Sequence, residues 1–399
     1  MPVSERVRSA LSSSSMIRKM FEEGLVLKKL HGADKVFDFS LGNPDIEPPE
    51  SFRRTLIELA SERNPGMHGY MPNAGFAATR AALAEKTSRE QSVKVPAQNI
   101  IMSCGAAGAL NVVFRALLNP DDEIIVPSPY FPEYRWYITH HGGRFIDVPS
   151  AEDFSLDPRA ISAALTPKTA AVLINSPHNP TGRLYSAESL RDLAAVLYAH
   201  EKKTGHLPYL IADEPYREVV YDGLVVPSVF AAYRNALVVT SYSKSLSLPG
   251  ERIGFIAVRP DADDSELLLE SLVFATRTLG FVNAPALMQR CVARLTEATV
   301  DVSVYARRRA AFIRVLDEAG ISYSKPEGAF YLFARVPERR GSADDLAFAD
   351  ALKQELILAV PGSGFGAPGW MRFAYCVSEG VINASSTALK RVVEGWHCG

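Results

Sequence analysis

The chain has 399 residues, of which 47% are hydrophobic, so it has enough apolar material for a large core that we expect to be divided between two domains. Its 43 Lys and Arg residues nearly balance 45 Asp and Glu residues, and the net charge of −2 gives no electrostatic reason to expect nucleic acid or an anionic membrane as a partner. No stretch approaches the ~18 consecutive apolar residues of a membrane-spanning helix, and the polar run at 11–15 does not fit a signal peptide.

The four cysteines are far apart in the sequence and form no C-x-x-C pair. They are Cys104, Cys291, Cys376 and Cys398. Disulfides persist in oxidising compartments, whereas isolated cysteines are typical of reduced ones. We therefore interpret all four as free thiols and expect a cytoplasmic protein.

The predicted elements begin with a helix over residues 16–30, where apolar positions recur at helical spacing until His31-Gly32 ends the pattern. Residues 37–45, FDFSLGNPD, follow as a short strand that ends in a Gly-Asn-Pro turn.

From about residue 75 to 260, helical stretches alternate with short, continuous runs of apolar residues. These runs are NIIMS (99–103), EIIVP (123–127), AAVLIN (170–175), YLIAD (209–213), ALVVTS (236–241) and GFIAV (254–258). Continuous runs rich in Val, Ile and Leu, separated by crossover helices, are typical of strands that helices cover on both faces. The pattern predicts an α/β fold with a mostly parallel sheet.

Small, polar or ionisable residues follow five of these runs. Residues 104–108 (CGAAG) follow the first, 128–131 the second and 176–182 (SPHNPTG) the third, while Asp213 ends the fourth and Lys244 lies just beyond the fifth. In open α/β sheets ligands bind at the carboxyl ends of the strands. We therefore expect these residues to converge on one crevice.

Beyond residue 286 the pattern changes to an α+β type. A helical stretch over 286–319 precedes two short strands within 321–336, and a helix within 343–356 and a strand within 371–377 follow. The change predicts a second, smaller domain.

This change in pattern sets the predicted domain boundaries. We assign residues 46–285 to a large domain and residues 286–399 to a small C-terminal domain. Residues 1–45 form an N-terminal segment that we expect to join the small domain and to cover the crevice.

The clearest chemical signal surrounds one lysine. Ser241, Ser243 and Lys244 follow a predicted buried strand, and Arg252 lies eight residues beyond the lysine. A lysine amine can capture an aldehyde, while hydroxyls and a guanidinium hold a phosphate. Asp213 ends another strand, where an unpaired carboxylate is costly and a pyridine N–H would give it a partner. The structural alternatives are a surface lysine and, for the aspartate, a helix N-cap.

These segments and their order resemble the class I aminotransferases of the aspartate aminotransferase family. The matching segments are SLGNPD (40–45), GYMPNAG (69–75), CGAAGAL (104–110), SPHNPTG (176–182), ADEPY (212–216), SYSKSLSLPGERIG (241–254), EGAFYLF (327–333) and MRFAY (371–375). The resemblance implies pyridoxal phosphate (PLP) fold type I, with a seven-stranded type of sheet in the large domain. It also implies a PLP-dependent enzyme that moves an amino group between an L-amino acid and a 2-oxo acid in two ping-pong half-reactions.

The resemblance assigns roles to individual residues. Lys244 forms the Schiff base and acts as general acid and base, which requires its pKa to fall below the usual ~10.4. Asp213 pairs with the pyridine nitrogen, Tyr216 and Asn179 bind the phenolic oxygen, and Tyr130 occupies the position of the aromatic residue that stacks on the ring. The cofactor-binding residues that it implies are Gly105, Ala106, Ala107, Tyr130, Asn179, Asp213, Tyr216, Ser241, Ser243, Lys244, Arg252 and Tyr70.

Substrate contacts and a dimer follow from the same resemblance. Arg372 binds the α-carboxylate, with Gly42 and Asn179 beside it. Tyr70 reaches the phosphate of the neighbouring subunit, which implies a homodimer. Arg277 lies where some members place a second arginine for acidic side chains, and we leave open whether it has that role or is solvated.

Two alternatives for the function remain open at this point. The shared cofactor site also serves β-elimination, racemisation and oxidation of amino acids. A non-catalytic PLP-binding regulator is a further alternative, although such proteins carry a DNA-binding extension and the first motif here begins near residue 40. The sequence does not identify the amino acid.

Overall fold

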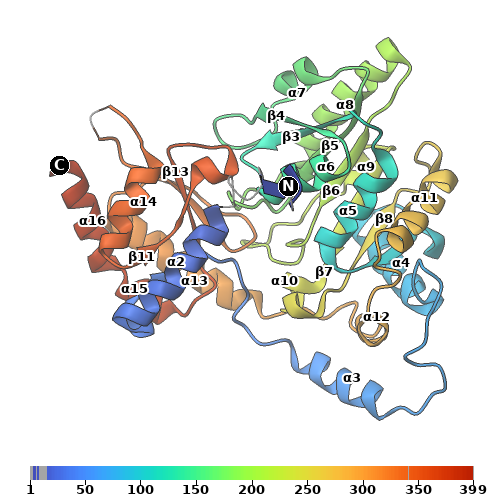
Figure 1. Ribbon diagram of the computed structural model, residues 1–399, viewed down its shortest axis with the longest axis horizontal. Helices are drawn as coiled ribbons and strands as arrows, with labels where there is room; N and C mark the ends of the chain where they lie inside the picture. The colour runs from blue at the N-terminus through green and yellow to red at the C-terminus, as the bar shows by residue number, and fades with distance from the viewer. Residues whose placement is uncertain (1–2, 6, 9–15, 340, 399) are drawn as a thin grey trace.

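The computed structural model of the protein describes residues 3–5, 7–8, 16–339 and 341–398. Figure 1 shows a large sheet with its helices on the right, and the N-terminal helix α2 (Met16–His31) among the C-terminal helices on the left. Residues from the two ends of the chain therefore build one part of the molecule together.

The larger part is built on a seven-stranded sheet with the strand order β2-β8-β7-β6-β5-β3-β4. The strands are β2 (Ile100–Ser103), β3 (Glu123–Ser128), β4 (Arg144–Pro149), β5 (Thr169–Asn175), β6 (Tyr209–Asp213), β7 (Ala236–Ser241) and β8 (Gly254–Val258). The neighbours from β7 to β4 pair in parallel, whereas β8 runs antiparallel to both β2 and β7.

This sheet confirms the predicted α/β fold, and all six predicted runs form strands in it. The seventh strand, β4, was not predicted. It lies at the edge of the sheet, and only three of its six residues are half-buried or buried, without forming a continuous apolar run. An edge strand of this kind lacks the sequence signal that a strand buried on both faces carries.

Helices cover both faces of the sheet. On one face lie α5 (Gly105–Leu117), α6 (Glu133–His140) and α11 (Ser265–Thr278), and on the other α3 (Glu50–Ser61), α4 (Ala77–Gln91), α7 (Pro158–Ala164), α8 (Ala187–Thr204), α9 (Val229–Ala232) and α12 (Ala286–Ala293). Successive side chains of a strand point to opposite faces. Accordingly, Ile101 packs in the core under α5, α6 and α11, whereas Ile100 and Met102 pack in the core on the opposite face.

The smaller part contains a four-stranded antiparallel sheet with the order β12-β13-β10-β9. Its strands are β9 (Tyr323–Ser324), β10 (Tyr331–Arg335), β12 (Val360–Pro361) and β13 (Trp370–Ala374). The helices around it are α13 (Val302–Glu318), α14 (Asp345–Gln354), α15 (Glu379–Ala384) and α16 (Ser386–Cys398). The predicted single helical stretch over 286–319 is two helices, because the chain leaves α12 at Arg294 and restarts at Asp301, whose carboxylate caps α13.

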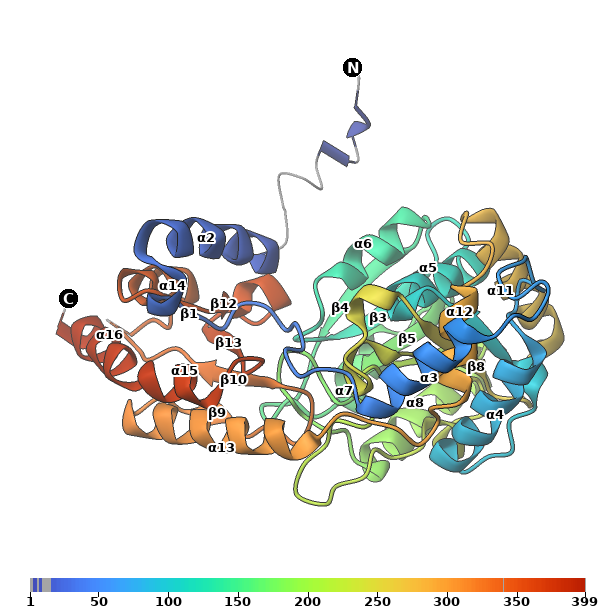
Figure 2. The ribbon, with the colours of Figure 1, turned by 90° about the horizontal axis from the view of Figure 1, so that it is seen from below.

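The N-terminal segment packs on this smaller part. Strand β1 (Phe37–Asp38) pairs in parallel with β11 (Ile357–Leu358), and Lys353 Nζ lies 3.0 Å from Glu23 Oε2. Both views show α2 beside α14 (Figures 1 and 2). The chain then runs from β1 toward the large sheet and carries Leu41 and Gly42 to the boundary between the two parts.

Among the residues that the structure describes, no helix is both long enough and apolar enough to cross a membrane.

Candidate active site

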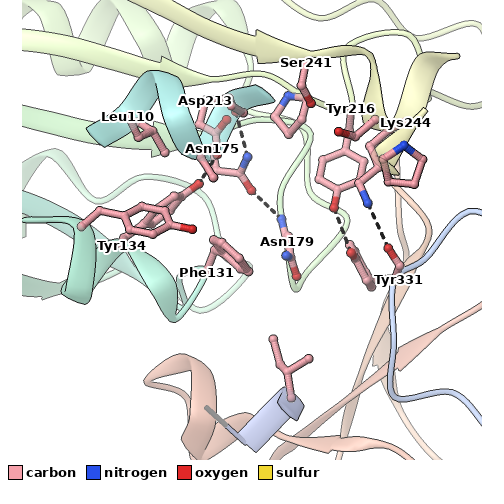
Figure 3. Close-up of a pocket in the computed structure, with 18 of the residues that line it drawn as sticks. Leu110, Phe131, Tyr134, Asn175, Asn179, Asp213, Tyr216, Ser241, Lys244 and Tyr331 are labelled. Atoms are coloured by element: carbon pink, nitrogen blue, oxygen red, sulfur yellow. Dashed lines mark hydrogen bonds between the residues drawn. The ribbon is translucent and has the colours of Figure 1, made fainter. Parts of the chain in front are cut away.

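A cavity of about 290 Å³ opens where the carboxyl ends of β5, β6 and β7 face the smaller sheet (Figure 3). Its lining combines residues from both parts of the molecule: Ile17, Leu41, Gly42, Ala106, Ala107, Leu110, Phe131, Tyr134, Tyr137, Asn175, Asn179, Asp213, Pro215, Tyr216, Ser241, Ser243, Lys244, Pro249, Arg252, Tyr331 and Arg372. The predicted convergence of strand ends on one crevice therefore occurs.

Lys244 projects into the cavity from α10 (Tyr242–Ser245), a single turn of helix that follows β7 directly. Its Nζ donates a hydrogen bond to the carbonyl oxygen of Gly42 at 2.9 Å, and no carboxylate forms an ion pair with it among the described residues. Removal from water lowers the pKa of Lys244 to about 8, and the nearby Arg372 and Arg252 also lower it. A substantial fraction of this amine is thus neutral near pH 8, as a nucleophile or a base requires.

Asp213 ends β6 and is 6% exposed. Its Oδ2 accepts a hydrogen bond from the Tyr134 hydroxyl at 2.5 Å, whereas its Oδ1 has no partner among the described residues (Figure 3). Burial raises the pKa of Asp213 to about 7, and the charge of Glu214 adds to that effect while the Tyr134 bond opposes it. A buried oxygen without a donor is costly, so this carboxyl group suits a cationic N–H in the cavity.

Arg372 lies on β13 and is 1% exposed. Its Nη1 donates to Asn179 Oδ1 at 3.0 Å and its Nη2 to the Ser40 carbonyl oxygen at 2.7 Å. Among the described residues no carboxylate pairs with it, and its Nε has no partner. Burial lowers the pKa of Arg372, yet a guanidinium remains protonated, so the cavity holds a buried cation without a counter-ion. Such a cation is suited to a carboxylate.

A second unpaired cation lies beside the start of α5. Arg252 lines the cavity together with Ala106, Ala107, Ser241 and Ser243, and among the described residues it forms no ion pair. The first turn of an α-helix presents unbonded backbone N–H groups and a partial positive charge. The start of α5, the hydroxyls of Ser241 and Ser243 and the guanidinium of Arg252 together form a suitable site for a phosphate.

Gly105 makes the approach of Arg252 possible. Its φ is +74°, and a side chain there would place Cβ only 2.7 Å from Arg252 Nη2. Gly105 therefore packs against the guanidinium of Arg252 but does not line the cavity.

Two further residues assigned from the sequence lie outside the cavity. Tyr130 accepts a hydrogen bond from Arg135 Nη2 at 3.0 Å, and its ring packs edge-on against Phe145. Of the adjacent residues Tyr130 and Phe131, it is Phe131 that lines the cavity, so the ring-stacking role assigned to Tyr130 does not fit this geometry. Tyr70 is 95% exposed and does not reach the cavity of its own chain.

Arg277 also lies away from the cavity. It is exposed on α11, and its guanidinium lies 5.4 Å from the ring of Phe274 on the same helix. Within one chain it therefore has no contact with a ligand at Lys244.

Several residues of the site were missed in the sequence. Phe131 lies in the segment 128–131 that was expected to reach the crevice, whereas Tyr134 lies beyond it on α6 and was not indicated by the sequence. Asn175 ends β5, and its side chain donates to the Asp213 carbonyl oxygen at 2.8 Å. Tyr331 comes from β10 of the smaller part, and only the folded chain brings it to the cavity.

Pyridoxal phosphate places three requirements on a site that binds it. The group needs an amine for its aldehyde, an acid for its ring nitrogen and a cationic pocket for its phosphate. Lys244 supplies a largely desolvated amine, the unpartnered Oδ1 of Asp213 supplies the acid, and Arg252 at the start of α5 supplies the pocket. The residues present therefore fit this cofactor.

Comparison with known proteins agrees with this arrangement. Residues 34–387 match the family model described as "Aminotransferase class I and II". The chain is 30% identical to an aspartate aminotransferase of Bacillus subtilis, covering 90% of this chain and 91% of that protein. It is 27% identical to aromatic-amino-acid aminotransferase 2 of Thermococcus litoralis, covering 99% of each. A crystal structure of an aminotransferase from Eubacterium rectale superposes with a TM-score of 0.95 at 39% identity, covering 99% of each chain.

Proposed function

This chain belongs to the class I and II aminotransferase family, and we propose that the side chains around Lys244 carry out its chemistry. The protein is a PLP-dependent enzyme that moves an amino group between an amino acid and a 2-oxo acid. When bound, pyridoxal phosphate supplies an aldehyde that captures the amino group and a ring that accepts the electrons of the broken C–H bond. One observation carries the assignment of roles. A lysine amine with a lowered pKa, a buried carboxyl oxygen without a hydrogen-bond partner and two guanidinium groups without an ion pair line the same cavity.

Lys244 holds the cofactor through its Nζ and afterwards moves a proton at the α-carbon of the substrate. A pKa near 8 gives the amine both protonation states at neutral to slightly alkaline pH, which a group that takes up and returns one proton requires. Its 2.9 Å bond to the Gly42 carbonyl oxygen orients Nζ within the cavity.

Asp213 holds the protonated ring nitrogen through Oδ1, while Tyr134 fixes its other oxygen. A cation beside this carboxyl group lowers its pKa from about 7 and keeps it ionised, because opposite charges favour the charged form. Tyr216 and Asn179 face the same cavity and hold the phenolic oxygen. In place of Tyr130, we propose Phe131 as the ring that packs on the cofactor.

The start of α5 would hold the phosphate of the cofactor. Ala106 and Ala107 offer backbone N–H groups there, because these first residues of a helix have no carbonyl partner in the preceding turn. Ser241, Ser243 and Arg252 add two hydroxyls and a charge. Ala106 and Ala107 add no hydroxyl, so the backbone N–H groups, the two serines and Arg252 would provide the phosphate contacts.

Arg372 holds the α-carboxylate of the substrate. Its Nη1 and Nη2 already donate hydrogen bonds to Asn179 and Ser40, and these bonds fix the plane of the guanidinium. A substrate carboxylate therefore meets a pre-oriented cation. Gly42 lies beside this site, where a larger residue would collide with Tyr331.

The space left for the substrate side chain favours apolar and aromatic amino acids. Apart from the residues already assigned, the lining consists mainly of Ile17, Leu41, Leu110 and Tyr137. Among the described residues of one chain, no further lysine or arginine lines the cavity to receive a second carboxylate. The names of the relatives include both aspartate and aromatic-amino-acid aminotransferases, and the lining supports the second type.

The proposal includes a homodimer in the cytoplasm. Support for the dimer comes from Tyr70, which is 95% exposed within one chain. The free thiols of Cys104, Cys291 and Cys376 support a reducing compartment. The proposed smaller body combines residues 1–45 with the C-terminal part of the chain, supported by the pairing of β1 with β11. We move its start from the predicted residue 286 to α13, because α12 packs in the core of the large sheet through Met288 and Cys291.

Borohydride reduction tests the central assignment. The reagent fixes the cofactor on the amine that holds it, and peptide mapping then identifies the residue. We expect the label on Lys244 alone, and no label on Lys244→Arg protein, in which the charge is retained. A panel of amino acids, followed by the colour change of the purified enzyme, reports the preferred side chain. Label on another lysine contradicts the assignment.

A further inference from the structure

Tyr331 touches both functional ends of the cavity, and the roles discussed so far do not use it. It lies on β10, is 3% exposed and lines the cavity. Its hydroxyl lies 2.8 Å from the hydroxyl of Tyr216, as Figure 3 shows, and its ring centroid lies 4.6 Å from Cζ of Arg372. One side chain therefore contacts the tyrosine of the cofactor site and the arginine of the carboxylate site.

The bond between the two hydroxyls has only one consistent direction when a ligand is present. Burial raises the pKa of Tyr331 to about 12 and that of Tyr216 well above its ordinary value, so each hydroxyl keeps its single proton at neutral pH. If Tyr216 gives its proton to an acceptor in the cavity, then Tyr331 must be the donor of the shared bond. A hydroxyl that accepts one hydrogen bond becomes a stronger donor of the next.

The ring of Tyr331 acts on Arg372 in a different way. The guanidinium lies 4.6 Å from the ring centroid of Tyr331 and 4.8 Å from that of Phe365. Contacts between a cation and aromatic faces are strongest where water is excluded, and Arg372 is 1% exposed. These two rings therefore stabilise the charge of an arginine that has no acidic partner among the described residues.

The position of Tyr331 is closely determined. A Cβ atom on Gly42 would lie 2.0 Å from the Tyr331 hydroxyl oxygen, so the absence of a side chain at residue 42 makes room for this hydroxyl. The same Gly42 accepts the hydrogen bond of Lys244 Nζ. The backbone at Gly42 therefore limits the movement of the tyrosine on that side.

We propose that Tyr331 is a positioning residue that serves both ends of the site, its hydroxyl directing the proton of Tyr216 into the cavity and its ring holding the guanidinium of Arg372. This inference rests on the proposed roles of Tyr216 and Arg372. It predicts that the two effects are separable, because Tyr331→Phe removes only the hydroxyl, whereas Tyr331→Leu removes the ring as well.

Two measurements on the holoenzyme test the proposal without relying on activity. The first is the pKa of the bound chromophore from its absorbance between pH 5 and 10. A weaker donor at the phenolic oxygen leaves more negative charge beside the titrating proton, so we expect Tyr331→Phe to raise this pKa by roughly half a pH unit. Tyr216→Phe should raise it further, and the double variant should match Tyr216→Phe alone.

The second measurement is the Kd of 3-phenylpropionate, an unreactive carboxylate, by calorimetry. Tyr331→Phe should stay within about threefold of the unmodified enzyme, and Tyr331→Leu should bind roughly 5- to 30-fold more weakly, as the loss of a desolvated cation–ring contact predicts. Tyr305→Phe is the matched control, because it removes a buried hydroxyl of the same core that has no hydrogen-bond partner among the described residues. It should change neither value.

The outcomes separate two kinds of failure. An unchanged chromophore pKa in Tyr331→Phe, where Tyr216→Phe shifts it, overturns the role of the hydroxyl. Unchanged binding in Tyr331→Leu, where Arg372→Lys weakens it, overturns the role of the ring. If Tyr216→Phe and Arg372→Lys themselves have no effect, the proposed function of those two residues is wrong and the inference falls with it.

Discussion

Replacing Asp213 with asparagine should stabilise the apoprotein while it disables the enzyme. The carboxyl group is buried with one unpartnered oxygen, and its pKa is raised to about 7 from the ordinary 3.8. Between these two values the folded protein holds a proton that the unfolded chain releases. The free energy of unfolding of the apoprotein therefore decreases as pH rises through this window, and the group gives no further change above pH 7.

The magnitude follows from the size of the shift. One pH unit between the folded and unfolded pKa corresponds to ~1.4 kcal/mol. Between pH 5 and pH 8 the folded carboxyl titrates over about two units, so the unmodified apoprotein should lose ~3 kcal/mol relative to Asp213→Asn. In the holoenzyme the same substitution removes the charge beside the ring nitrogen, and we expect kcat to fall by about 100-fold or more.

Urea unfolding of both apoproteins at pH 5, 6, 7 and 8 measures the effect. Groups that titrate equally in the two proteins cancel in the difference between their unfolding free energies, so the difference isolates Asp213. We expect it to grow with pH and to level off above pH 7. A difference that is the same at every pH would refute the reasoning that burial holds this carboxyl group protonated.

Four further predictions concern other residues of the site and of the proposed subunit interface. Tyr134→Phe removes a hydrogen bond that lowers the pKa of Asp213, so this pKa should rise further in the variant. The decrease of the unfolding free energy with pH should then continue to a higher pH in the variant apoprotein than in the unmodified one, as measured by urea unfolding. Arg372→Lys should lower kcat/KM for all amino acids by ~10- to 100-fold through loss of the two-point contact, with the cofactor still bound. Arg277→Ala should change the kinetics of acidic substrates only, and only if Arg277 reaches the site of a partner subunit. Mixing Tyr70→Phe with Lys244→Ala subunits should restore activity above that of either variant, and activity that stays at their level argues against shared sites.

Most strands of the large sheet and the central residues of the candidate site could be predicted from the amino-acid sequence. Six apolar runs predicted six strands, because strands buried on both faces need continuous hydrophobic residues. Lys244, Asp213 and Arg252 could be named because strand ends in such a sheet meet at one edge. The family resemblance added Arg372, which the periodicity of β13 alone does not mark as functional.

The residues that complete the site around these groups could not be predicted, because their positions depend on how distant segments pack. Phe131 rather than Tyr130 lines the cavity, because one residue of register after β3 decides which ring faces the ligand and which packs against Phe145. Tyr331 reaches Tyr216 from a strand 115 residues away in sequence. The pKa values of Lys244 and the site carboxyl group likewise follow from desolvation, which depends on every chain segment that closes over them and not on the local sequence.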